Sequence, residues 1–277
     1  MVFGRNPVRK PAVAGMFYPD HPLQLKTSVE RLLVRMMEPV ASIAVLVPHA
    51  GYIYSGATAG KTFTAATLPE KLIILCPNHT GLGTPISCWA KGAWETPLGT
   101  VPVNEALSDA LMASTPAIEA DEIAHMREHA IEVQLPFLQV MLESFSIVPV
   151  CVGTQDMKLM EALGMGMAAV IAASGEPVGI VVSSDMNHYE DAQTNRKKDD
   201  LALDALQRLA PEELHRVVMK NRITMCGVAP AVAALFAAKA LGADRSEVVD
   251  YTHSGMVTAD DREVVSYAGV RIYKETV

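Results

Sequence analysis

The sequence predicts an α/β fold, a single-domain αβα sandwich whose mixed sheet is mostly buried. Continuous apolar runs of strand length alternate along the chain with segments of helical period, a pattern typical of strands that helices cover on both faces. No repeat, low-complexity tract or flexible linker divides the 277 residues, so we expect one domain over residues 1–277.

The expected elements follow one another in a regular order. Strands are predicted at residues 43–47, 72–76, 147–152, 178–182 and 264–272, with a weaker one at 247–251. Helices are predicted at residues 22–37, 104–112, 128–143, 157–173, 202–209, 212–220 and 229–241. The segment 86–103 contains Trp89, Trp94 and several turn residues, which is typical of an antiparallel excursion and favours a mixed sheet over a purely parallel one.

The composition excludes several classes of protein. Half of the residues are hydrophobic (50%), 19% are charged and the mean hydropathy is +0.21, which indicates a large buried core and excludes intrinsic disorder. The 23 basic residues are outnumbered by 31 acidic ones, so a net charge of -8 argues against a nucleic-acid partner. The uncharged, Ala-rich stretch 223–238 is too short to cross a bilayer, and we therefore expect a cytoplasmic protein with no membrane partner.

Titratable side chains follow three of the predicted strands. His49 comes after strand 43–47, His79 after strand 72–76, and Asp185 and His188 after strand 178–182. In open α/β sheets ligands bind outside the carboxyl ends of the strands, so these segments are expected to meet in one cleft. A single histidine of this kind is as often a capping or core residue as a ligand. Its recurrence at three strand ends favours a metal or catalytic site that contains at least two of them.

Cys226 differs from the other three cysteines in its surroundings. It directly precedes an Ala-rich predicted helix, and a helix N-terminus favours the thiolate, the form that binds metal or attacks an electrophile. Cys76, Cys88 and Cys151 lie in or beside apolar strands, where a cysteine is usually a small buried side chain. Cys226 is therefore the candidate ligand or nucleophile.

Residues 125–129 match the His-x-x-Glu-His pattern of inverted zinc peptidases. That pattern needs a helix and a third ligand further along the chain, but Pro136 interrupts the following helix and no downstream glutamate on a clear second helix supplies that ligand. We favour the alternative that Glu128 and His129 begin a helix whose polar start faces the same cleft. His129 would then contact the substrate or support a ligand.

Taken together, several segments resemble the Memo-like proteins, which are related in fold to the class III extradiol dioxygenases. They include Pro-His-Ala-Gly-Tyr-Ile-Tyr-Ser-Gly at 48–56 and Arg-Glu-His-Ala-Ile-Glu-Val-Gln-Leu-Pro-Phe at 127–137. The remaining segments are 11–19, 77–81, 183–188, 226–227 and 264–273. Each is short, but the set occurs in order over nearly the whole chain, which makes the resemblance specific.

The resemblance implies a metal in the cleft, above all Fe(II), with Cu or Zn as alternatives. It assigns His49, His79 and Cys226 as metal ligands and places His188 at the position of the acid/base histidine of the dioxygenases. It also implies that Asp185 and His129 line the same cleft. The true dioxygenases use a carboxylate as third ligand, whereas the softer thiolate of Cys226 suits Cu(I) or a redox role as well as Fe(II). Ring cleavage therefore does not transfer directly.

Three functions fit these residues. The first is a non-haem metal enzyme with oxidative or redox activity on a small substrate, in which His188 moves protons. The second is a protein that binds metal, a small molecule or a peptide in the cleft without turnover. The third is a zinc-dependent hydrolase with His188 or Asp185 as base. The resemblance further implies association with a radical-SAM protein and a small accessory protein.

Overall fold

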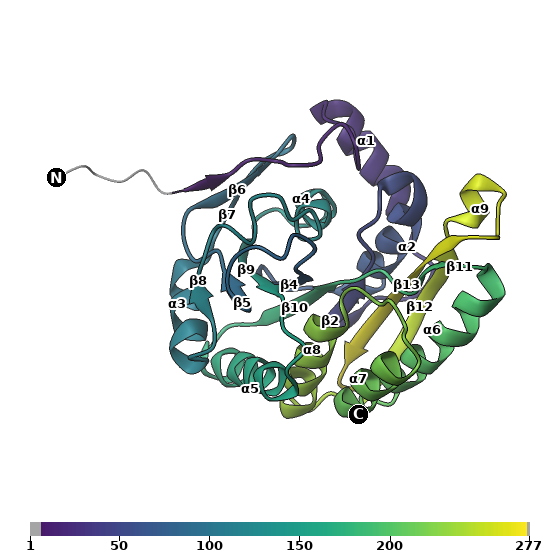
Figure 1. Cartoon of the computed structure of the whole chain (residues 1–277). Coiled ribbons are helices and arrows are strands. Elements are labelled where there is room, and N and C mark those ends of the chain that lie inside the picture. The colour runs from purple at the N-terminus through teal and green to yellow at the C-terminus, as the bar shows by residue number, and fades with distance from the viewer. Residues whose placement is uncertain (1–6, 276–277) are drawn as a thin grey trace.

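The computed structural model describes residues 7–275 and is built around a 10-stranded sheet (Figure 1). Its centre consists of four parallel strands that lie side by side in the order β2, β10, β4 and β9. Their bounds are Val40–Val47 for β2, Val178–Ser183 for β10, Lys71–Pro77 for β4 and Ser146–Val152 for β9. All four match predicted strands, and their carboxyl ends lie at the same edge of the sheet.

Antiparallel strands flank this centre, which confirms the predicted mixed sheet. On one side β13 (Val264–Tyr273) pairs antiparallel with β2, β12 (Arg245–His253) and β11 (His188–Glu190). On the other side β5 (Ile86–Cys88) pairs antiparallel with β9 and parallel with β8 (Glu119–Ala120). The short strand β3 (Ala66–Thr67) pairs parallel with the start of β2. The predicted excursion forms part of a small second sheet, in which β6 (Ala93–Thr96) pairs with β7 (Gly99–Pro102) and β1 (Val8–Arg9).

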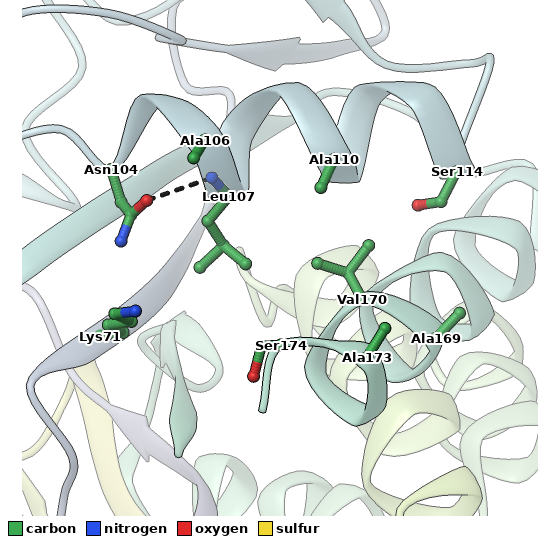
Figure 2. A pocket seen from close by; sticks show the side chains of 10 residues that line it. All are labelled: Lys71, Asn104, Ala106, Leu107, Ala110, Ser114, Ala169, Val170, Ala173 and Ser174. Carbon is green, nitrogen blue, oxygen red and sulfur yellow. Dashed lines mark hydrogen bonds between the residues drawn. The ribbon is translucent and has the colours of Figure 1, made fainter. Parts of the chain in front are cut away.

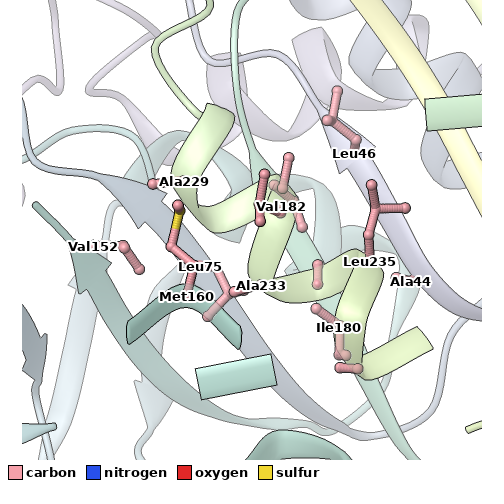
Figure 3. Close-up of a cluster of buried hydrophobic side chains, with 14 of the residues drawn as sticks. Ala44, Leu46, Leu75, Val152, Met160, Ile180, Val182, Ala229, Ala233 and Leu235 are labelled. Carbon is pink, nitrogen blue, oxygen red and sulfur yellow. The ribbon is translucent and has the colours of Figure 1, made fainter. Parts of the chain in front are cut away.

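Both faces of the central sheet are buried. Along β2, Ala44 and Leu46 join one hydrophobic cluster, and Val45 and Val47 join the other, as the two-residue period of a strand requires. Figure 3 shows the first cluster, where β2, β4 and β10 pack against α8. Its helices are α3 (Glu105–Ser114), α5 (Met157–Ala173), α6 (Ala192–Gln207), α7 (Pro211–Lys220) and α8 (Val228–Ala240).

The second cluster lies under α1 (Pro22–Leu32), α2 (Tyr52–Thr64) and α4 (Leu135–Met141). Helices therefore cover the sheet on both sides, and the αβα sandwich is confirmed. None of the helices within residues 7–275, the short α9 (Gly255–Thr258) included, is both long and apolar enough to cross a membrane.

Helix α2 (Tyr52–Thr64) is a difference from the sequence prediction, which placed no helix between residues 37 and 104. The strand β2 is followed by a short turn, and the helix begins at Tyr52. Gly56 and Gly60 lie on the side of α2 that faces α1, and a Cβ on Gly60 would come within 2.0 Å of the Leu32 carbonyl oxygen. These glycines therefore permit close helix packing, and they are not turn residues.

Three other helices differ in their bounds, and the first of them, α1, ends at Leu32 instead of at the predicted residue 37. The predicted helix 128–143 is shorter, because residues 121–131 form turns and only the 3-10 turn Glu132–Gln134 and α4 follow. Helix α6 begins earlier than predicted, because the Asp191 side chain accepts hydrogen bonds from the amides of Gln193 and Thr194 and caps the helix.

Candidate metal centre

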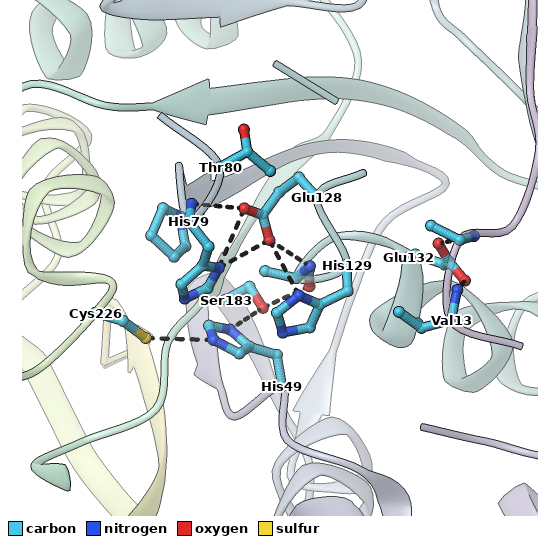
Figure 4. Close-up of polar contacts among 12 residues, drawn as sticks. Val13, His49, His79, Thr80, Glu128, His129, Glu132, Ser183 and Cys226 are labelled. Atoms are coloured by element: carbon cyan, nitrogen blue, oxygen red, sulfur yellow. Dashed lines mark hydrogen bonds and ion pairs between the residues drawn. The ribbon is translucent and has the colours of Figure 1, made fainter. Parts of the chain in front are cut away.

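The strand order brings three of the predicted segments to one place. Strands β2, β10 and β4 are neighbours and parallel, so His49, Asp185 and His79, which follow their carboxyl ends, lie together at one edge of the sheet. Figure 4 shows the imidazoles of His49, His79 and His129 converging there. The structure therefore brings together strand-end residues that the sequence expected to meet.

His49 is held in one orientation by Ser183. The Ser183 hydroxyl donates its single proton to the Ala130 carbonyl (2.6 Å) and so accepts from His49 Nδ1 (2.9 Å). The neutral ring then keeps its lone pair on Nε2. The backbone N–H of His49 donates to Asp185 Oδ1 at 2.7 Å. Burial lowers the pKa of His49 to about 3, which favours the neutral imidazole that binds metals.

His79 is anchored in the same manner by Glu128. This carboxylate is fully buried and accepts from the His79 backbone N–H (2.7 Å), from His79 Nδ1 (2.9 Å) and from the Ala130 N–H (2.9 Å). Burial alone would raise the pKa of Glu128, but the hydrogen bond and charge of His79 outweigh it and lower the pKa to about 2. Because a carboxylate only accepts hydrogen bonds, His79 Nδ1 carries the ring proton. His79 Nε2 therefore keeps the lone pair that can bind a metal.

His129 completes a group of three histidines. One nitrogen from each of His49, His79 and His129 lies within 4.8 Å of the others, so the three rings can share one ion. The His129 Nδ1 lies 3.5 Å from Glu128 Oε1, and its ring packs 4.6 Å from that of Phe17. Burial lowers the pKa of His129 to about 4, which again favours the neutral ring. The structure therefore adds His129 as a candidate ligand, where the sequence suggested contact with substrate or support of a ligand.

Cys226 lies beside this group, against His49. Its Sγ is 3.3 Å from His49 Nε2 and accepts from the Asp185 backbone N–H, also at 3.3 Å. Burial and the charge of Asp185 raise the pKa of the thiol, opposite to the lowering that a helix start alone predicts. A cation at the centre would reverse this balance and favour the thiolate. Cys226 thus lies against His49, but its Sγ is not among the atoms that lie within 4.8 Å of one another in the three-histidine group.

Asp185 and His188 lie next to the group. Asp185 is buried, and its Oδ2 is 3.9 Å from His49 Nε2, while burial raises the pKa of its carboxyl group. The His188 backbone N–H donates to Thr224 Oγ1 (2.7 Å), and that hydroxyl also lies 3.5 Å from His188 Nδ1. Because Thr224 is two residues before Cys226, this contact ties the His188 loop to the cysteine loop.

Sequence reasoning missed what Glu128 does. It treated Glu128 as the start of a helix, whereas the structure makes it the common anchor of His79 and His129. Its position beside His129 in the His-x-x-Glu-His pattern was the available signal. The peptidase interpretation of that pattern fails, because residues 121–131 form turns and His125 Nε2 lies 3.1 Å from the Ser87 carbonyl oxygen.

A groove elsewhere on the molecule is separate from this chemistry. Its volume is about 430 Å³. Figure 2 shows Leu107 and Val170 lining it between α3 and α5. Lys71, at its edge, begins β4, whereas His79 follows the other end of that strand. The groove therefore lies toward the opposite edge of the sheet from the histidines.

Fold and site together define an α/β protein with a histidine-rich candidate metal centre at the carboxyl edge of its parallel strands. The model of the family described as "Memo-like protein" matches residues 9–271. A "MEMO1 family protein" of Aquifex aeolicus is 44% identical over 95% of this chain and 98% of its own length. A protein of the same description from Thermotoga maritima is 37% identical over 96% and 99%. The chain belongs to the Memo-like family.

The fold is also found in a solved structure of low sequence identity. The uncharacterized protein JW3007 of Escherichia coli K12 matches with a TM-score of 0.55 over 81% of this chain and 98% of its own length. The sequences are only 15% identical, so this similarity concerns the fold alone.

Proposed function

We propose that the chain binds one Fe(II) ion between His49, His79 and their neighbours and carries out oxidative chemistry on a small ligand in the same cleft. The observation that supports this proposal is the three-histidine group, whose donor nitrogens lie within 4.8 Å of one another. Two of its rings are fixed by Ser183 and Glu128 through Nδ1, so Nε2 keeps the lone pair in each, and Nε2 of His49 lies against Cys226 Sγ.

The residues fit such an ion. Imidazole is a good ligand for iron, copper and zinc, and a thiolate from Cys226 would add a negative charge and a soft donor. Ring nitrogens that bind metals usually have their second nitrogen held by a carboxylate or another acceptor, as in His79 with Glu128 and His49 with Ser183. Burial also keeps His49 neutral near pH 7, since its pKa is lowered to about 3.

Bound iron would supply redox chemistry and a binding position for a chelating substrate. The protein's own groups then divide the remaining work. His188 would move a proton, because it follows β10 and Asp185 along the chain and its backbone N–H donates to Thr224. Asp185 holds the His49 backbone and the Cys226 loop in place.

The test is elemental analysis of protein purified without oxygen, with oxygen uptake measured over a panel of hydroxylated compounds. We expect about one iron per chain and loss of most of it in His49→Ala and in His79→Ala, with the fold kept. His21→Ala is the matched control, because His21 is an exposed histidine that precedes α1. Unchanged metal content in both site variants would contradict the assignment.

A zinc-dependent hydrolase is the second candidate, and the same three histidines favour it. Three histidines are an established ligand set for catalytic zinc, which supplies Lewis-acid chemistry for hydrolysis. In that case His188 or Asp185 would act as the base. Zinc in place of iron, together with no oxygen uptake, would favour this candidate over the first.

A further inference from the structure

Gln134 is a fully buried polar residue that the proposed function does not yet use. It is the last residue of the short 3-10 turn Glu132–Gln134, which precedes α4. Its Nε2 donates one hydrogen bond to the Pro48 carbonyl and one to Ser183 Oγ, each at 2.9 Å. Both partners concern His49, because Pro48 directly precedes it and Ser183 holds its ring. One amide group therefore contacts both the backbone and the anchor of the same histidine.

The unpaired oxygen of Gln134 argues against a purely stabilising role. Within residues 7–275, no donor meets its Oε1, although the atom is buried. The amide group cannot be reversed, because the Pro48 carbonyl only accepts and requires an N–H opposite it. A buried acceptor without a partner costs free energy that an apolar side chain of the same shape would avoid. What Gln134 offers instead is a pair of donors aimed at the two groups that orient His49.

The turn that carries Gln134 is itself firmly held. Glu132, two residues earlier, is buried and pairs with the guanidinium of Arg9. Its carboxylate also accepts from the Tyr18 hydroxyl (2.6 Å) and from two backbone amides of the N-terminal segment (2.8 and 3.0 Å). A donor on a turn held in this way can keep its acceptors within a narrow range of positions.

The hydroxyl group of Ser183 is fully used in this arrangement. Its oxygen accepts from Gln134 Nε2 and from His49 Nδ1, while its single proton goes to the Ala130 carbonyl. Figure 4 shows the contact between Ser183 and the His49 ring. A hydroxyl has one proton and two lone pairs, so all three have a partner. Without Gln134 one lone pair would be unpaired, and the hydroxyl and the ring could shift together.

We propose that Gln134 is a positioning residue of the metal centre, which holds the His49 imidazole in the orientation that binds the ion. It acts through Ser183 on the ring and through Pro48 on the backbone, and it is not itself a ligand. The inference rests on the proposed function, because this orientation serves metal binding only if His49 is a ligand.

The first test compares Gln134→Met with Gln139→Met in competitive Fe(II) titrations without oxygen. Methionine is about as long as glutamine but cannot donate a hydrogen bond. Gln139 is the matched control, because it lies on α4 and its side chain also makes hydrogen bonds, to the hairpin of β6 and β7. We expect Gln134→Met to weaken Fe(II) binding about two- to tenfold, the effect of one hydrogen bond on an equilibrium. Gln139→Met should bind Fe(II) like the wild type.

Nitrogen NMR of histidine-labelled protein without metal gives a readout that a general loss of stability would not produce. We expect Gln134→Met to shift or broaden the ring signals of His49 and to leave those of His79 unchanged, because Glu128 holds His79. The loss of Fe(II) affinity should also be smaller in a Ser183→Ala background, where one partner of Gln134 is missing. Equal perturbation of both rings, or an equal loss in both backgrounds, would overturn the inference.

Two further results separate this inference from the function beneath it. If the wild type binds Fe(II) and Gln134→Met binds it as tightly, the inference is wrong and the metal centre stands. If the wild type binds no Fe(II), the proposed function fails and the inference fails with it.

Hydrogen exchange in the wild type decides the matter if Gln134→Met does not fold. Both protons of the Gln134 side-chain amide meet buried acceptors, so they should exchange slowly with solvent. Fast exchange of this amide would show that the two hydrogen bonds do not hold, and the inference would fail.

Discussion

Replacing Glu128 with glutamine tests whether the buried carboxylate prepares the metal centre. Glu128→Gln keeps the size of the side chain. It removes the negative charge of the carboxylate that accepts hydrogen bonds from His79 Nδ1 and from the His79 backbone N–H. The pKa of Glu128 is about 2 in the fold against an ordinary 4.5, which corresponds to about 3 kcal/mol of preference for the charged form. Loss of such an anchor typically lowers metal affinity about 10- to 100-fold.

The assay is a competitive metal titration of Glu128→Gln, wild type and the control Glu122→Gln, which changes an exposed carboxylate of the same segment. A second readout is stability against pH. Because the folded pKa of Glu128 is depressed, its stabilisation is present above about pH 4.5 and is lost as the pH falls toward 2. The deficit of Glu128→Gln should therefore be largest near neutral pH and shrink in acid. Equal metal affinity in all three proteins would refute the reasoning.

Three other predictions follow from the structure. Burial lowers the pKa of His125 to about 4, so the unfolded chain takes up a proton first and wild-type stability should fall as the pH drops from about 6.5 to 4. Urea unfolding of His125→Gln should show a shallower fall, by up to about 3 kcal/mol, and an equal slope would contradict this account. Cys226→Ser should weaken metal binding and alter the absorption of a cobalt-substituted site, whereas Cys88→Ser, in a buried strand, should do neither; matching spectra in both variants would remove the thiolate. His188→Ala should keep the metal and reduce any oxygen-dependent turnover about 10²- to 10⁴-fold, and retained turnover would exclude it as the proton carrier.

The sequence is informative where a residue's neighbours along the chain decide its conformation. Strands β4 and β10 are buried on both faces, so their continuous apolar runs predict them well. Helix α2 was missed, and only the approach of α1 explains why Gly56 and Gly60 lie within it. The turns before α4 are also held by contacts between residues that lie far apart in the sequence. Arg9 donates to the carbonyl oxygens of His125 and Glu128, and no local pattern reports this.

The residues of the candidate site also fall into two groups, those that the local sequence predicts and those that only tertiary contacts place. His49 and His79 could be found because each directly follows a parallel strand, and the strand order places them together. His129 comes from a turn, and its membership in the group depends on Glu128 and on the packing of Phe17. The place of Cys226 was suggested by the family resemblance, but its contact with His49 depends on tertiary structure.

Anomalous diffraction at the iron absorption edge, from crystals of protein loaded with Fe(II) under anaerobic conditions, tests the central claim most directly. The account predicts one strong peak at about 2.0–2.2 Å from a nitrogen of both His49 and His79, a usual length for a metal bond to imidazole. The same map would show whether His129, Cys226 or both complete the ligand set. A peak away from His49 and His79, or no peak in fully loaded crystals, would contradict the assignment of this edge of the sheet as a metal centre.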